Sequence, residues 1–233
     1  MKRKCCFFGA LMGVTFSGAS LAQTDPMQPT LVGGASELHG LELGLRVGYG
    51  VPLGSTAGTV AGGSADFSSS IKGMIPFWAD VGYRINPNWY VGGFFQFGLG
   101  MLPSNSVFCN MTGVNCSEND LRAGINVHYH LLPTESFDPW VGIGAGYEWL
   151  NETISPAGQP DISSKLDGFE FGNIHLGVDY KVSQNFGVGP FVTFTIAQFA
   201  NSSFAGVSGS LTDKKIHEWL IFGIRGVYDL AFD

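Results

Sequence analysis

Apolar residues alternate strictly with polar or small residues along much of this chain. From Leu41 to Val51 every odd position holds leucine, valine or tyrosine, whereas the even positions hold glycine, Glu42 and Arg46. Because successive side chains of a β-strand point to opposite faces, a period of two predicts a strand with one apolar face. The pattern predicts eight strands, over residues 41–51, 74–85, 89–101, 121–131, 140–150, 173–182, 186–197 and 218–232.

The connections between these stretches alternate in length. Residues 86–88, 132–139 and 183–185 make short turns, whereas the other connections are long and rich in glycine, serine and asparagine. Segments of about ten residues suit tilted strands that cross a bilayer, and outer-membrane barrels carry short turns on one rim and long loops on the other. The sequence therefore predicts an all-β fold, an eight-stranded antiparallel up-and-down transmembrane β-barrel with short periplasmic turns and long extracellular loops. A parity change at Phe169 and Phe171 predicts a β-bulge near Gly172.

The composition of the two faces indicates which one points outward. A soluble lipocalin-like barrel would bury its apolar face. Here the apolar face is bulky and continuous, whereas the other face is too rich in glycine and charge to fill a dry core. We therefore expect Phe95, Val127 and Ile224 to contact lipid. Aromatic residues near strand ends, Trp89, Trp140 and Tyr228 among them, are expected to form interfacial girdles.

Charged residues on the polar faces match across neighbouring strands. Antiparallel strands in one register keep the sum of facing residue numbers constant. The numbers of Glu42 and Arg84 add up to 126, and those of Arg46 and Asp80 give the same sum. Both pairs are therefore predicted to be salt bridges between directly opposed residues of the interior.

A third interior salt bridge is predicted between Arg122 and Glu148. Their numbers add up to 270, a register centred on the turn between the fourth and fifth strands, and this register also places His130 beside Trp140. Further residues expected to fill the lumen are Trp78, Phe94, Arg225 and Asp229.

The N-terminal residues have the composition of an export signal. A basic start over residues 2–4 is followed by an apolar run to about Val14 and by small residues up to Ala22, where we expect cleavage. The predicted organisation is a signal peptide over 1–22, a short periplasmic N-terminal segment over 23–40 and an outer-membrane β-barrel domain over 41–233.

The net charge of the chain argues against one class of partner, nucleic acid. The chain carries a net charge of −7, and removal of a basic leader makes the remainder more acidic. Nucleic acid is therefore not expected as a partner, because phosphate binding requires clustered lysine and arginine.

Cys109 and Cys116 flank a short polar stretch. In an oxidising exported setting, and without a nearby cluster of metal ligands, we expect a local disulfide that stiffens a loop. No cofactor is predicted.

The last predicted strand ends in an alternating run from Arg225 to Phe232. With eight strands and alternating loops, this run makes the chain resemble the small outer-membrane β-barrels of the OmpA and OmpX type. The resemblance implies the outer membrane of a Gram-negative bacterium, outer-membrane lipid as the surroundings, and the barrel-assembly machinery as a partner. That machinery would read Tyr228, Leu230 and Phe232 as an assembly signal, although Asp233 follows the aromatic residue that is usually last in the family.

Three functions are compatible with such a barrel. Eight strands leave a lumen just wide enough for side chains or one small ligand, so the first is a structural or surface-interaction protein with a plugged interior and an unidentified extracellular ligand. The second is a narrow conduit for ions or a small solute. The third, less favoured, is a lipid-modifying enzyme, for which the loop residues His217, Ser208, Ser210 and Asp213 are candidates. Inward-facing His128, His130 and His175 are expected to form neutral hydrogen bonds in preference to binding a metal.

Overall fold

The computed structural model describes residues 39–55, 66–103 and 109–231. The predicted signal peptide, nearly all of the segment 23–40, and Phe232 of the predicted assembly signal lie outside the described residues.

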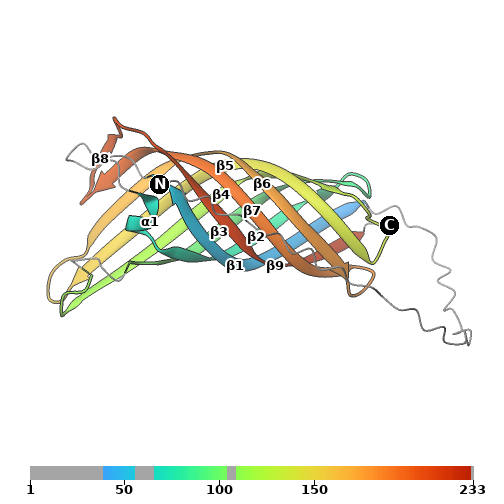
Figure 1. The fold of residues 1–233 in the computed structure, drawn as a ribbon, viewed down its shortest axis with the longest axis horizontal. Coiled ribbons are helices and arrows are strands. Elements are labelled where there is room, and N and C mark those ends of the chain that lie inside the picture. Colours follow the sequence, from blue (N-terminus) through green and yellow to red (C-terminus); the bar gives the residue numbers. More distant parts are fainter. Residues whose placement is uncertain (1–38, 56–65, 104–108, 232–233) are drawn as a thin grey trace, which may run out of the picture. The chain divides into compact units, whose positions relative to one another are not determined.

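Eight long strands dominate the described residues (Figure 1). Their bounds are β1 Gly40–Gly54, β2 Gly73–Arg84, β3 Trp89–Met101, β4 Val114–His130, β5 Phe137–Pro156, β6 Ile162–Lys181, β7 Phe186–Phe204 and β9 Ile216–Ala231. The two smaller elements are the helix α1 Phe67–Ser70 and the strand β8 Val207–Ser210. The part of the chain that the structure describes contains no helix long and apolar enough to cross a membrane.

The strands close into an antiparallel barrel. Strands β1 to β7 pair in chain order, β9 pairs with β7 on one side and with β1 on the other, and this last pairing closes the ring. Closure leaves no free edge among the eight long strands within the ring, so their backbone amides find partners inside the sheet.

Alternation along each strand separates a lipid-facing surface from a lumen. Phe95 is 51%, Ile125 70% and Ile224 58% exposed in the isolated chain, whereas the charged residues of the opposite parity are buried. An exposed apolar surface of this extent needs lipid to cover it, so these residues form an apolar belt that contacts acyl chains.

The strands continue beyond the apolar belt at one end. The outward residues of β4 are Asn115, Ser117 and Asn119 before they become apolar at Leu121. Residues 114–119 of β4 therefore lie outside the membrane-spanning segment.

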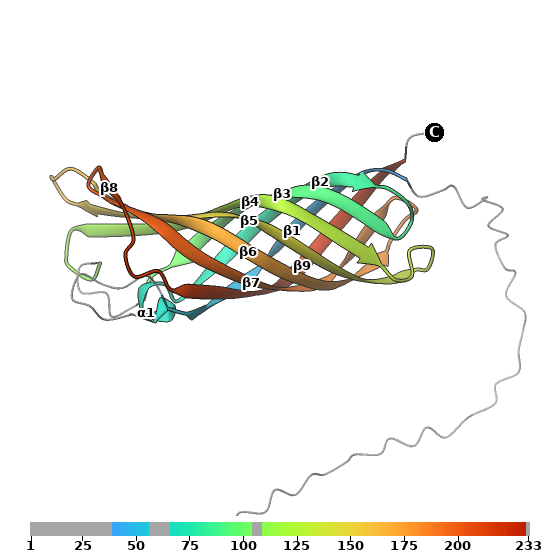
Figure 2. The same cartoon turned by 90° about the horizontal axis from the view of Figure 1, so that it is seen from above.

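The two rims of the barrel differ. The turn rim consists of residues 85–88, 131–136 and 182–185, and the loop rim carries α1, β8 and the longer connections. Figure 2 shows α1 and β8 at the same end of the barrel.

Two of the expected long loops are largely strand. β5 and β6 are joined by residues 157–161 alone, and β7 and β8 by residues 205–206. Water surrounds these hairpins, so polar side chains occur on both of their faces. An alternation of apolar and polar residues therefore does not predict them as strands. At the turn rim, Pro139 likewise belongs to β5.

The predicted register is right for one strand pair and wrong for another. Arg122 faces Glu148 and His130 faces Trp140, as the sum of 270 requires. Between β1 and β2, however, Leu41 faces Tyr83, so the sum is 124 and the predicted sum of 126 is wrong. The bulge expected near Gly172 is present as a register shift between Glu170 and Gly172.

The helix α1 and the residue that follows it bring two apolar side chains into the lumen at the loop rim. Phe67 and Ile71 are fully buried, and the ring of Phe67 lies 5.0 Å from that of Trp219 and 4.9 Å from that of His217. A disulfide joins Cys109 to Cys116, with Cα atoms 5.6 Å apart, and thus ties the preceding connection to the start of β4.

We expect Ile125→Arg to destabilise the barrel by about 2–4 kcal/mol, because the guanidinium would enter the hydrocarbon near mid-membrane. Urea unfolding in lipid vesicles measures this loss. Ser117→Arg, on the outward face of the same strand above the belt, is the matched control and should cost less than about 1 kcal/mol. Equal losses at the two positions would contradict the placement of the belt.

Candidate functional site

All four arginines beyond the predicted leader lie inside the barrel. Arg46 is 3%, Arg84 4%, Arg122 0% and Arg225 0% exposed. Each of them contacts at least one carboxylate, so the lumen is crossed by three ionic clusters at successive heights. Arginine suits such sites because its planar fork of donors matches carboxylate geometry.

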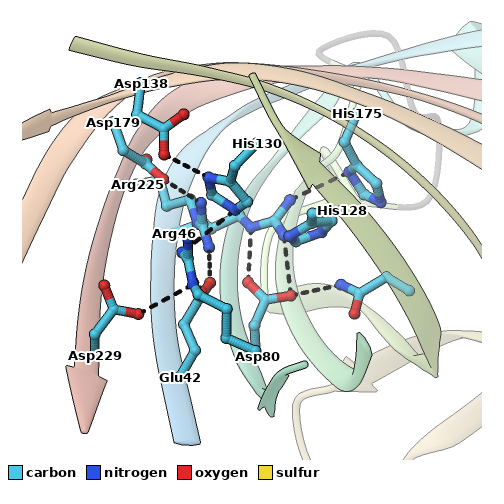
Figure 3. A network of polar contacts seen from close by, with 12 residues as sticks. Glu42, Arg46, Asp80, His128, His130, Asp138, His175, Asp179, Arg225 and Asp229 are labelled. Carbon is cyan, nitrogen blue, oxygen red and sulfur yellow. Dashed lines mark hydrogen bonds and ion pairs between the residues drawn. The ribbon is translucent and has the colours of Figure 1, made fainter. Parts of the chain in front are cut away.

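The turn-side cluster joins Glu42, Arg84, Arg225 and Asp179. Figure 3 shows Glu42, Arg225 and Asp179 close together. Arg84 Nε donates to Glu42 Oε2 at 3.0 Å, and Arg225 donates to the other oxygen of the same carboxylate. Arg225 Nη1 also donates to Asp179 Oδ2 at 2.6 Å. Asp229, at the turn rim, lies 3.5 Å from Arg84 Nε and keeps a side chain that is 20% exposed.

The middle cluster is built around Arg46. Its Nε donates to Asp80 Oδ2 at 2.8 Å and its Nη2 to Asp80 Oδ1 at 3.0 Å, a bidentate pair. The same guanidinium reaches His175 Nδ1 at 3.2 Å and His128 Nε2 at 3.4 Å (Figure 3). It lies 4.9 Å from the ring centroid of Trp78, within cation–π distance.

The loop-side cluster gathers three carboxylates on Arg122. Nε donates to Asp120 Oδ2 at 2.9 Å, Nη2 donates to Glu148 Oε1 at 3.1 Å, and Nη1 lies 3.4 Å from Glu170 Oε2. Glu148 also contacts His217 Nε2 at 2.8 Å. This cluster holds more negative than positive charge.

A glycine makes room for one of these ions. Gly44 lies opposite Asp80, where a Cβ would be 3.0 Å from Asp80 Oδ2, whereas Gly82, opposite Glu42, makes room for Tyr90, whose Cε2 would lie 2.6 Å from a Cβ there. The arginines reach their partners diagonally along the strands, which long side chains can do. Both predicted pairs are therefore in contact although neither is directly opposed.

The geometry of the histidines indicates neutral rings. Arg84 Nη2 lies 3.4 Å from His130 Nε2, and since a guanidinium can only donate, that nitrogen must be an acceptor. The proton then sits on His130 Nδ1, which lies 2.7 Å from Asp138 Oδ2. His128 and His175 each turn one nitrogen to Arg46 in the same way.

Glu42, His128 and His130 also place ligand atoms within 4.8 Å of one another. A metal ion there would compete with guanidinium groups that already contact all three residues. Arg84 contacts Glu42 and His130 Nε2, and Arg46 contacts His128 Nε2. The arrangement therefore favours hydrogen bonding over metal binding at this point.

Several lumen residues were not identified from the sequence. Asp179 is on the predicted polar face, Asp120 lies before the predicted start of its strand, and Glu170 lies next to the bulge. Inward parity is the signal that would have found them, once the strands are extended to their true ends.

Trp140 was expected in an interfacial girdle, and that prediction is wrong. The side chain is 1% exposed inside the lumen, where Arg225 lies 4.6 Å from its ring centroid. Its ring lies over Gly177, where a Cβ would be 2.4 Å from Trp140 Cζ2. The remaining predicted lumen residues, Trp78 and Phe94, are buried with their rings 4.8 Å apart.

The residues considered as catalytic candidates lie in different environments. His217 is fully buried against Glu148, whereas Ser208 and Ser210 are exposed on β8. Asp213 pairs with Lys215 at 3.0 Å. These side chains do not form a nucleophile–base–acid arrangement.

We expect Arg46→Met to lower the free energy of unfolding by about 3–5 kcal/mol, because Asp80 would remain buried without its partner. The double variant Arg46→Met/Asp80→Leu should lose less than Arg46→Met alone, since no unpaired charge remains. Urea unfolding in vesicles measures both. Lys215→Met, at a side chain that is 40% exposed, is a control that changes stability by less than about 1 kcal/mol. Additive losses in the double variant would show that the two residues are not coupled.

The sequence matches no protein-family model and no curated protein. Among solved structures, the outer membrane protein OprG from Pseudomonas aeruginosa is 12% identical with a TM-score of 0.50, over 84% of this chain and 99% of that chain. Neisserial surface protein A is 14% identical with a TM-score of 0.47, over 82% of this chain and 97% of that chain. The outer membrane protease OmpT from Escherichia coli is 10% identical with a TM-score of 0.42, over 87% of this chain and 99% of that chain.

At such identities the likeness concerns the fold and leaves activity open. The closed ring, the outward apolar belt and the polar lumen are the features of that fold. The chain has the fold of a small outer-membrane β-barrel, with eight long strands in a closed ring, and its outward apolar belt suits a membrane.

Proposed function

We propose that this protein is a sealed outer-membrane barrel that displays an interaction surface outside the cell and does not conduct. The observation that carries the proposal is the set of three ionic clusters that cross the lumen.

The guanidiniums connect strands that are not neighbours in the ring. Arg46 of β1 reaches His128 of β4 and His175 of β6, so its contacts cross the barrel from wall to wall. Arg122 of β4 approaches Thr195 of β7 at 3.5 Å in the same manner. In an eight-stranded barrel side chains suffice to fill the interior.

The apolar residues at the loop rim add a further barrier. Phe67 and Ile71 pack with Phe199 and Trp219 above the loop-side cluster. A solute would have to displace both this apolar layer and the ion pairs below it, and breaking buried ion pairs costs several kcal/mol.

The loop rim offers a surface for partners. β5, β6, β7 and β8 continue as paired strands beyond the apolar belt. At the tip of the β7–β8 hairpin, Phe204 is 61% and Val207 77% exposed. Exposed apolar side chains at a protruding tip favour contact with another macromolecule.

The surroundings and the assembly partner follow from the same fold. We expect outer-membrane lipid to cover the belt and the barrel-assembly machinery to recognise the C-terminal strand. Tyr228 and Leu230 support this expectation, because both are exposed on the outward face of β9.

We expect the purified barrel to be electrically silent in planar lipid bilayers, because the clusters leave no continuous aqueous path. Heat-modifiable gel mobility of the same sample verifies that the barrel is folded. Reproducible single-channel steps from the folded protein would overturn the sealed-lumen proposal and favour the narrow conduit.

Replacement of both apolar tip residues, Phe204→Ser/Val207→Ser, should reduce adhesion of cells that express the protein while leaving barrel stability unchanged. Met111→Ser, at another residue that is 56% exposed, is the matched control. Adhesion of intact cells to host cells and to abiotic surfaces measures the effect. Unchanged adhesion of the double variant would contradict a role for the tip.

A further inference from the structure

The outward apolar belt contains a groove at the place where the barrel closes. The groove has a volume of about 560 Å³, within the range of about 300–1,000 Å³ that small-molecule sites occupy. It spans β9, β1, β2 and β3, so it lies over both strands of the pair that closes the ring. Its floor and walls include Ala79, Gly226, Phe77, Phe95, Phe97 and Ile224.

Two small residues form the floor of this groove. The register places Gly226, Leu45, Ala79 and Phe95 in one row across four adjacent strands. Within the row, Gly226 has no side chain and Ala79 has a methyl group, whereas Phe95 is 51% exposed. Phe77 precedes Ala79 by two residues on the same face and is 48% exposed. The belt is therefore recessed at the two small residues, between large side chains that stand above them.

The recess at Gly226 is not imposed by the backbone. Gly226 is not among the glycines with a positive φ, so a residue with a side chain could adopt its conformation. Apart from its chain neighbours, the nearest atoms to a Cβ at Gly226 belong to the ring of Phe186, at 3.6 Å, an ordinary van der Waals distance. The missing side chain thus leaves open space, and this space belongs to the groove.

The surroundings of the groove indicate what fills it. The groove is continuous with the belt, which contacts acyl chains along its whole surface. Its outward side chains are apolar, so they offer no partners to a water molecule. An empty recess would also forfeit the dispersion contacts of the atoms that line it. Hydrocarbon from the membrane is therefore the occupant that this surface fits.

We propose that the groove binds one acyl chain of a membrane lipid and retains it while the other chains around the barrel exchange. Lipid tails are as apolar as the belt, so the hydrophobic effect does not distinguish the groove from the rest of the surface. The preference arises from van der Waals packing, because a chain in the groove touches the floor and both walls. A retained chain also packs over β9 and β1 together. This site goes beyond the sealed-barrel function and does not depend on it.

The test uses the full-length folded barrel in phosphatidylcholine vesicles that contain a trace of a phospholipid with a diazirine in the middle of one acyl chain. Irradiation, digestion and mass spectrometry measure the lipid that becomes attached at each residue. We expect about fivefold more label at Phe77 than at Ile125, the ratio that roughly ten additional carbon contacts produce. Exposure alone predicts the opposite order, since Ile125 is 70% exposed and Phe77 48%.

Variants that fill the floor make the result specific. Ala79→Leu and Gly226→Leu, each made separately, should reduce the label at Phe77 toward the level at Ile125, because their side chains occupy the recess. Ala145→Leu is the matched control and should leave the label at Phe77 unchanged. It makes the same change on β5, opposite Ile125 and on the other side of the ring from β1. Heat-modifiable gel mobility verifies that each variant is folded.

Three results would overturn the proposal. The first is equal label at Phe77 and Ile125 in the parent, which would mean that all chains around the belt exchange alike. The second is unchanged label at Phe77 in both floor variants. The third is a cross-link between two copies of the protein when a photoactivatable leucine is incorporated at the position of Leu45, which would mean that a second barrel fills the groove. None of these results bears on conductance, so failure here is separable from failure of the sealed-barrel function.

Discussion

A backbone amide in hydrocarbon has no water to bond, and this constraint governs the whole molecule. Pairing of β9 with β1 satisfies it by removing the sheet edges of the ring. Once the sheet is closed, alternate side chains must point to lipid or into a narrow interior. The outward apolar belt and the polar lumen are two consequences of the same closure.

The narrow interior in turn selects its residues. Arginine brings donors on a long stem, and glycine on a facing strand leaves room for the partner carboxylate, as Gly44 does for Asp80. Buried ion pairs are weak evidence for net stability, but an unpaired member is very costly. The clusters thus act mainly by making any packing of the lumen that leaves one of these charges unpaired unfavourable. At the loop end, Arg122 alone contacts three carboxylates, those of Asp120, Glu148 and Glu170.

A sequence-based prediction was accurate where the strand has one apolar face, and inaccurate where it does not or where long side chains meet diagonally. Strand β3 has the predicted bounds, because its outward positions are apolar along its whole length except at Gly93. Upper β5 and β6 were expected as loops, because strands solvated on both faces carry no apolar period. The register of β1 and β2 was wrong by two residues, since the length of an arginine side chain allows Arg46 to reach Asp80 diagonally.

The sequence by itself determined the number of long strands, the direction of each face and the burial of the arginines, because these depend on a local period of two. The tertiary structure alone decided which side chains meet across the lumen. Arg46 meets His128 and His175, and Trp140 turns inward beneath Arg225, because closure and stagger of the ring bring distant strands together. Such contacts depend on the path of the whole chain, which no local pattern encodes.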